Sequence, residues 1–133
     1  MSKSFVISVV VMFVMALALG FVVHGLLLHA DYGQIPGVMR TDADGQKHMA
    51  FMMLGQLCFV VAFVWIYQRG REAKPAIPQG LRYGLAMAAL TVAAKFLIYY
   101  AVEPIPGMLV AKQIIFDSIG VMLMGVVLAA INK

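Results

Sequence analysis

Four long apolar stretches of the chain each contain a polar or ionisable side chain, and these side chains are the best placed to do chemistry. They are His24, Gln56, Lys95 and Asp117. Counted inward from one end of each stretch at the helical rise, all four lie roughly 8–12 Å deep. In a membrane, a charge at that depth is costly and marks a functional site by default. The pattern predicts a polar layer inside a helical bundle.

Lys95 and Asp117 are the predicted ion pair of this layer, because they are its two members of opposite charge. Steps of three and four residues place each of them on a helix face with other polar or small side chains. The remaining members of the predicted layer are His24, Gln56, Tyr99 and Gln113. Three roles fit such a layer: a network that fixes helix register, a site for a proton, ion or small polar ligand, and a surface completed by a partner protein.

The three histidines and one aspartate form a second candidate group near the same ends of the stretches. His24, His29, Asp31 and His48 offer imidazole and carboxylate ligands to zinc or copper. However, His24 and His29 are five residues apart and diverge by about 140° on a continuous helix. Histidines without a ligand are therefore the favoured interpretation. A haem would need an axial ligand in an apolar slot, and His24 is the one buried candidate, so we expect no cofactor.

The composition and the length of the apolar stretches determine the fold class. Hydrophobic residues make up 63% of the chain and charged residues 12%, whereas soluble domains are about a quarter charged. A membrane helix needs about 20 apolar residues. The sequence predicts one domain, residues 1–133, an all-α, antiparallel up-down bundle of four transmembrane helices. The predicted spans are 5–28, 49–67, 81–102 and 110–131.

The first stretch resembles a signal peptide but is too long, because the apolar region of a signal peptide spans roughly 7–15 residues. We therefore expect it to be retained as a span. Basic residues then give the orientation through the positive-inside rule. One side carries Lys3, Arg69, Arg71, Lys74, Arg82 and Lys133, and the other carries Arg40, Lys47 and Lys112. Both termini are predicted to be cytoplasmic.

Two connecting segments have distinct turn chemistry. Pro75 and Pro78 predict an extended inner loop from Gln68 to Gln79, since proline interrupts a helix. Asp42-Ala43-Asp44-Gly45 matches the start of a calcium-binding loop, but the remainder of that pattern is missing. A solvated turn is therefore the favoured interpretation of these four residues.

Several short motifs follow one another in a characteristic order along nearly the whole chain. They are Gly25 after His24, Asp31-Tyr32, Pro36-Gly37 with Arg40, Ile66-Tyr67, Gly80-Leu81-Arg82-Tyr83-Gly84, Tyr99-Tyr100 with Pro104, and Lys112-Gln113 through Asp117. Together they resemble small four-helix bacterial membrane proteins classed as a domain of unknown function. The resemblance implies a bacterial inner-membrane location. The chain does not resemble the small multidrug transporters, whose first helix carries a glutamate, since its first helix has no acidic residue.

The sequence shows no nucleophile beside a base, no glycine-rich phosphate loop and no paired carboxylates, so we expect no enzyme activity. It also lacks the basic domain and aromatic platform of a nucleic-acid-binding protein. The favoured function is a non-catalytic accessory or self-associating subunit, in a homo-oligomer or a larger complex in the lipid bilayer. Small side chains at Ala16, Gly20, Gly84 and Ala88 can support helix association. The alternative is a small transporter or ligand-binding bundle with the Lys95–Asp117 pair as a titratable site.

Overall fold

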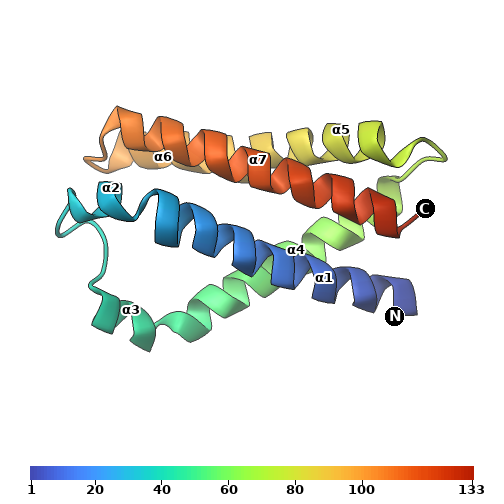
Figure 1. Cartoon of the computed structure of the whole chain (residues 1–133), viewed down its shortest axis with the longest axis horizontal. Coiled ribbons are helices and arrows are strands. Elements are labelled where there is room, and N and C mark those ends of the chain that lie inside the picture. The colour runs from blue at the N-terminus through green and yellow to red at the C-terminus, as the bar shows by residue number, and fades with distance from the viewer.

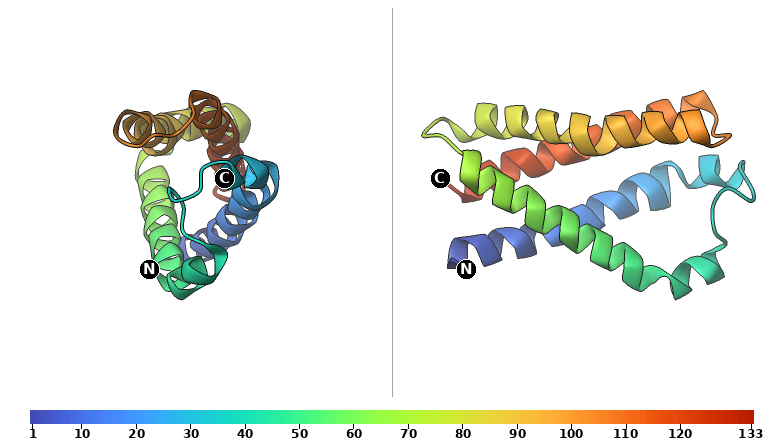
Figure 2. Two further views of the ribbon diagram at one scale, coloured as in Figure 1. Left: turned by 90° about the vertical axis from the view of Figure 1, so that its left-hand side faces the viewer. Right: turned by 180° about the vertical axis from the view of Figure 1, so that it is seen from behind.

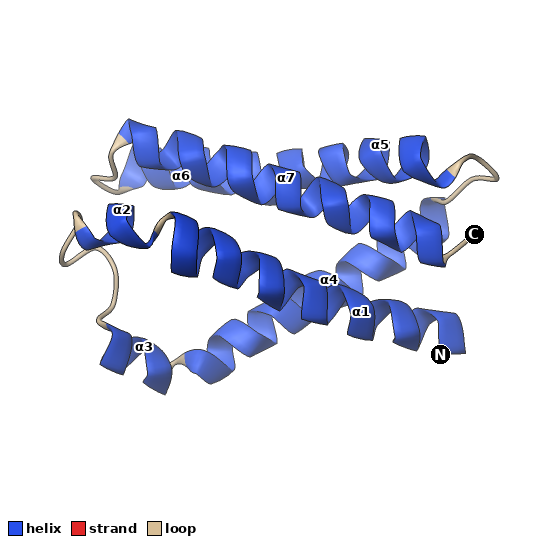
Figure 3. Ribbon diagram, viewed as in Figure 1, coloured by secondary structure: helices blue, strands red, loops and turns tan.

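The computed structural model describes all 133 residues, and it is built from helices (Figure 3). Four helical segments are long and apolar enough to cross a membrane, namely Lys3–Leu27, Met49–Gly70, Ala76–Val102 and Gly107–Ile131. The predicted all-helical class is confirmed, as is the prediction of four helices that are long and apolar enough to span a membrane. Three predicted spans agree with these bounds to within three residues at each end, and the third span begins five residues earlier than predicted.

Two of the four spans contain a π-helical segment within their length, and two short helices lie in the connection between the first and second spans. The elements in chain order are α1 (Lys3–Gly20), η1 (Phe21–Leu27), α2 (His29–Gly33), α3 (Asp42–Lys47), α4 (Met49–Gly70), α5 (Ala76–Ala88), η2 (Ala89–Ala93), α6 (Ala94–Val102) and α7 (Gly107–Ile131).

Both chain termini lie at one end of the elongated molecule, here called the terminal end, together with the connection between α4 and α5 (Figure 1). The opposite end, here called the loop end, carries α2, α3 and the short connection between α6 and α7 (Figure 1).

Helices α5 and α7 are in backbone contact, which requires glycine on both sides. A Cβ built on Gly80 would lie 2.5 Å from the Cα of Val126, and one on Gly125 would lie 2.4 Å from the carbonyl oxygen of Gly80. A Cβ on Gly84 would lie 2.6 Å from the Cα of Met122. Small residues allow such close helix contacts in membranes, where packing rather than burial from water holds helices together. This pair is the most closely packed part of the bundle.

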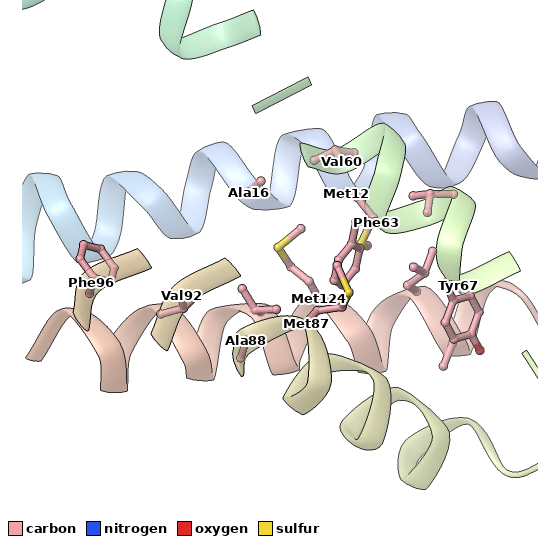
Figure 4. Close-up of a cluster of buried hydrophobic side chains, with 14 of the residues drawn as sticks. Met12, Ala16, Val60, Phe63, Tyr67, Met87, Ala88, Val92, Phe96 and Met124 are labelled. Carbon is pink, nitrogen blue, oxygen red and sulfur yellow. The ribbon is translucent and has the colours of Figure 1, made fainter. Parts of the chain in front are cut away.

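Helix α4 crosses the bundle obliquely and packs along only half of its length (Figure 2). Its buried residues are Val60, Phe63, Val64 and Tyr67, and they meet side chains of α1, α5 and α7 in the main core (Figure 4). The Tyr83 hydroxyl adds a polar contact by donating a hydrogen bond to the carbonyl oxygen of Phe63. The other half of α4, toward the loop end, is largely exposed and diverges from α1 (Figures 1 and 2).

At the terminal end, Asn132 ties α1, α4 and α7 together. Its Oδ1 accepts hydrogen bonds from Ser4 Oγ at 3.0 Å and Gln68 Nε2 at 2.9 Å. Its Nδ2 donates to Ser8 Oγ and to the carbonyl oxygen of Leu128, each at 2.9 Å. Asn132 is only 6% exposed and Ser8 only 1%. This network satisfies polar groups in an otherwise apolar core, as buried polar groups require.

We predict that Asn132→Leu lowers the free energy of unfolding by about 2 kcal/mol, because it leaves the buried Ser8 hydroxyl without its partner. Denaturant titration of the purified protein in detergent measures this difference. Lys133→Leu, at the neighbouring exposed position, is the matched control. Equal stability of the two variants would show that the network contributes nothing.

Two predictions for the connecting segments are wrong. Pro78 does not extend the inner loop, because α5 begins at Ala76 and Pro78 lies in its first turn, where the missing N–H group has no helical acceptor anyway. The predicted turn at Asp42–Gly45 is instead part of α3, which Thr41 caps by accepting a hydrogen bond from the backbone N–H of Asp44 at 3.3 Å.

Candidate functional site

A pocket of about 650 Å³, lined by apolar and polar side chains, lies among all four spans, in the half of the molecule toward the loop end. Five of the six residues of the predicted polar layer line it: His24, Gln56, Lys95, Tyr99 and Asp117. The sixth, Gln113, is 5% exposed and joins the same hydrogen-bond network. The pocket exists because α4 diverges from the other spans at this level.

Asp117 of α7 is paired with His24 of η1 and not with Lys95. His24 Nε2 lies 3.0 Å from each carboxylate oxygen of Asp117. The His24 side chain is 35% exposed and the Asp117 side chain 17%. No carboxylate oxygen lies within 4.0 Å of Lys95 Nζ, which sits over the ring of Phe96 at 4.4 Å. The predicted Lys95–Asp117 ion pair is therefore wrong, because His24, in the π-helical segment η1, contacts both oxygens of Asp117.

Tyr32 and Gln113 extend the pair into a directed chain of hydrogen bonds. Gln113 Nε2 donates to the Tyr32 hydroxyl at 3.1 Å, and that hydroxyl lies 2.5 Å from His24 Nδ1. With His24 neutral and protonated on Nε2, each donor has an acceptor, and the chain runs from Gln113 through Tyr32 and His24 to Asp117. Every dipole of the chain then points its positive end toward the carboxylate.

The short helix α2 brings Tyr32 to this position, and a small apolar cluster at the loop end anchors it. Val23, Leu28, Ile35 and Leu109 form this cluster, and Lys112 Nζ bonds to Asp31 Oδ1 at 2.9 Å beside it. Burial raises the pKa of the Tyr32 hydroxyl above its usual value. The hydrogen bond from Gln113 lowers this pKa, whereas the nearby carboxylates of Asp117 and Asp31 raise it further. Tyr32 therefore remains a hydrogen-bond donor at neutral pH.

Lys95 and Tyr99, from α6, are exposed on the pocket wall, as is Gln56 of α4 in part. None of these three side chains makes a hydrogen bond or an ion pair within the chain. Thr91 of η2 also lines the pocket, and its hydroxyl donates back to the carbonyl oxygen of Met87 at 2.8 Å. The pocket thus contains one satisfied carboxylate and one cation that no acidic side chain neutralises.

Both π-helical segments of the protein contribute to the pocket wall. η1 supplies Val23 and His24, and η2 supplies Thr91 and Val92. A π-helical turn inserts an extra residue into the helix and re-aims its side chains, and such turns occur frequently at functional sites. Their presence on two spans that face the same pocket distinguishes this region from the α-helical remainder of the bundle.

The four metal candidates do not come together. His24 is occupied by Asp117 and Tyr32, Asp31 by Lys112, and His48 Nδ1 lies 2.8 Å from the carbonyl oxygen of Asp44. No group of three or more His, Cys, Asp or Glu side chains is arranged to hold a metal ion. The hypothesis of a site formed by His24, His29, Asp31 and His48 therefore has no support in the geometry.

A larger surface hollow, of about 920 Å³, follows the connection between α4 and α5 at the terminal end. Three of its four charged residues already have partners: Glu72 pairs with Lys74 and Arg82, and Arg71 donates to the carbonyl oxygen of Asn132 at 2.6 Å. The hydrogen bond from Lys74 and its charge lower the pKa of Glu72. Because most of its charged side chains already have partners and a single connection forms most of its wall, this hollow is the weaker candidate.

Comparisons with known proteins return no relative. No protein-family model, curated protein or solved structure matches the chain. The resemblance to a bacterial domain of unknown function therefore stays a prediction that depends on its sequence motifs.

Tyr32 is the member of the network that sequence reasoning missed. It lies outside the apolar stretches, and only the loop-end cluster places it against His24. The available signal was its position eight residues after His24, which a short helical connection can fold back onto the preceding span. Asn132 was missed for a similar reason, because it follows the last helical residue.

Proposed function

We propose that this protein is a multi-pass protein of the bacterial inner membrane that binds a small polar or charged ligand in its polar pocket, without catalysis. Its four spans form an antiparallel up-down bundle with both termini in the cytoplasm, as the distribution of basic residues predicts. The loop end then faces outward, and the pocket opens in the outer half of the bilayer.

The observation that carries this proposal is the surplus of polar groups on the pocket wall. A purely structural network pairs its members with one another, and His24, Asp117, Tyr32 and Gln113 do so. The other lining groups, Lys95, Gln56 and Tyr99, remain free to bind a ligand. Buried or membrane-embedded polar groups without a partner are costly, so a ligand that supplies partners binds favourably.

A pocket-filling variant tests this proposal. Gly20 lines the pocket, and the nearest neighbour of a Cβ built on it is Gln56 Nε2 at 4.0 Å. Gly20→Leu is therefore expected to fold and to occupy space that the ligand needs. Val10→Leu, on the exposed side of the same helix, is the matched control.

The wild type and each variant are purified from bacterial membranes and then denatured. The small molecules that they release are identified by mass spectrometry. We expect one compound near equimolar amounts with the wild type and with Val10→Leu, and a loss of about tenfold with Gly20→Leu. The proposal fails if no compound accompanies the wild type, or if Gly20→Leu retains it fully while remaining folded by circular dichroism.

A second candidate function, an accessory or self-associating subunit, is favoured by a different observation. The half of α4 toward the loop end exposes apolar side chains such as Phe51, Leu54 and Leu57, which a partner helix can cover. The small residues predicted to mediate association do not support it, because Ala16, Gly84 and Ala88 are buried within the chain and Gly20 faces the pocket. This candidate is favoured if a second protein copurifies in stoichiometric amounts and if substitution of Leu54 abolishes that copurification.

A further inference from the structure

Among the charged side chains of the pocket wall, Lys95 is the one without a side-chain partner, and it is a cation. Asp117 is bound through both oxygens by His24, whereas no acidic side chain approaches Lys95 Nζ within 4.0 Å. Elsewhere at the loop end, Asp31 pairs with Lys112 and Asp44 with Arg40, and neither Asp42 nor Glu103 forms an ion pair with Lys95. The group that is missing beside Lys95 is therefore an anion.

The lining of the pocket is amphipathic. Apolar side chains from α4 and α7, namely Met52, Phe59 and Phe116, line the pocket together with Lys95 and Gln56. Beyond the pocket, the adjoining half of α4 presents exposed apolar side chains. An occupant with a charged head and an apolar chain matches both parts of this surface.

The pocket also opens sideways. Toward the loop end α4 diverges from the other spans and is largely exposed (Figures 1 and 2), so no packed helix pair separates the pocket from the acyl chains on that side. Lys95 lies seven residues from the end of α6 at Val102, or about 10 Å along the helix. A lipid headgroup from the same leaflet reaches Lys95 by moving inward, over a distance that the lysine side chain shortens by extending toward the interface.

We infer that the pocket binds the phosphate of an anionic phospholipid, which enters sideways beside α4 and places its headgroup against Lys95 and Gln56. Lys95 Nζ supplies three donors and the Gln56 amide two more, and hydrogen bonds to a charged oxygen are about twice as strong as neutral ones. The lipid neutralises Lys95, and its acyl chains cover the apolar wall of α4. This inference rests on the proposed function and names the class of its ligand.

Native mass spectrometry of the full chain in neutral detergent tests the inference. The protein is titrated with phosphatidylglycerol, with phosphatidylcholine of the same acyl chains, and with inorganic phosphate. We expect preferential binding of phosphatidylglycerol, and an affinity roughly tenfold lower for Lys95→Gln, which removes a charge-assisted hydrogen bond. Lys95→Arg is expected to retain the affinity. The matched control is Lys47→Gln. It removes an exposed cation of α3 at the loop end, and this cation makes no ion pair.

The other outcomes overturn the inference in distinguishable ways. If Lys95→Gln binds phosphatidylglycerol as the wild type does, the lipid binds elsewhere, for example at the basic terminal end. If inorganic phosphate binds with the same dependence on Lys95, the ligand is a free anion, and the proposed pocket function survives without the lipid. If Lys95→Gln abolishes a dimer of the protein instead, the occupant is a second copy. If the wild type releases no compound on denaturation, or if folded Gly20→Leu retains the compound fully, both the inference and the proposed function are wrong.

Discussion

Gly125→Ala and Gly84→Ala are expected to destabilise the protein by about 3 kcal/mol each, more than a single methyl group usually costs in a core. The added Cβ of Gly125 would lie 2.4 Å from the carbonyl oxygen of Gly80, and that of Gly84 would lie 2.6 Å from the Cα of Met122. Both neighbours are backbone atoms, which cannot rotate away as a side chain does. The helices α5 and α7 must therefore move apart.

Gly55→Ala is the control for this prediction. Gly55 lies in α4, and a Cβ built there has no neighbour within 4 Å. Since alanine favours a helix by about 1 kcal/mol over glycine, this variant is expected to be as stable as the wild type or slightly more so. Denaturant titration in detergent compares the three variants. Equal stability of Gly55→Ala and Gly125→Ala would show that α5 and α7 do not touch as described.

His24→Leu is the second variant with a large expected effect, a loss of about 2–3 kcal/mol. It removes the donor that contacts both oxygens of Asp117 and leaves a membrane-embedded carboxylate without its partner. It also leaves the Tyr32 hydroxyl without its acceptor. His29→Leu changes an exposed histidine that makes no hydrogen bond, and it is expected to have little effect. The same titration measures both variants, and similar losses for the two would contradict the network.

The four spans could be predicted from the sequence because their signal is local. Membrane spans are defined by length and apolar composition, and these properties needed no knowledge of packing. The start of the third span was missed because Pro78 was taken to end a helix, whereas proline is compatible with a first turn. The sequence also indicated which residues share one depth, and five of them line one pocket.

The partners within the polar layer could not be predicted in the same way. Assignment of Lys95 to Asp117 used charge alone, but the choice between Lys95 and His24 depends on how each helix is rotated. The π-helical segment that contains His24 changes that rotation, and regular helical spacing does not reveal it. Gly84 and Ala88 show the same limit, since small residues predict close packing but do not tell whether the neighbour is α7 or another chain.

The pairing of Asp117 is the claim on which the ligand argument depends, because a Lys95 engaged by Asp117 has no need of an anion. Two double-mutant cycles test it directly, one with His24→Leu and Asp117→Leu and the other with Lys95→Leu and Asp117→Leu. Residues in direct contact show coupling free energies of about 0.5–3 kcal/mol. We predict a coupling of about 1.5 kcal/mol or more between His24 and Asp117, and close to none between Lys95 and Asp117. The reverse order of the two coupling free energies would contradict the account.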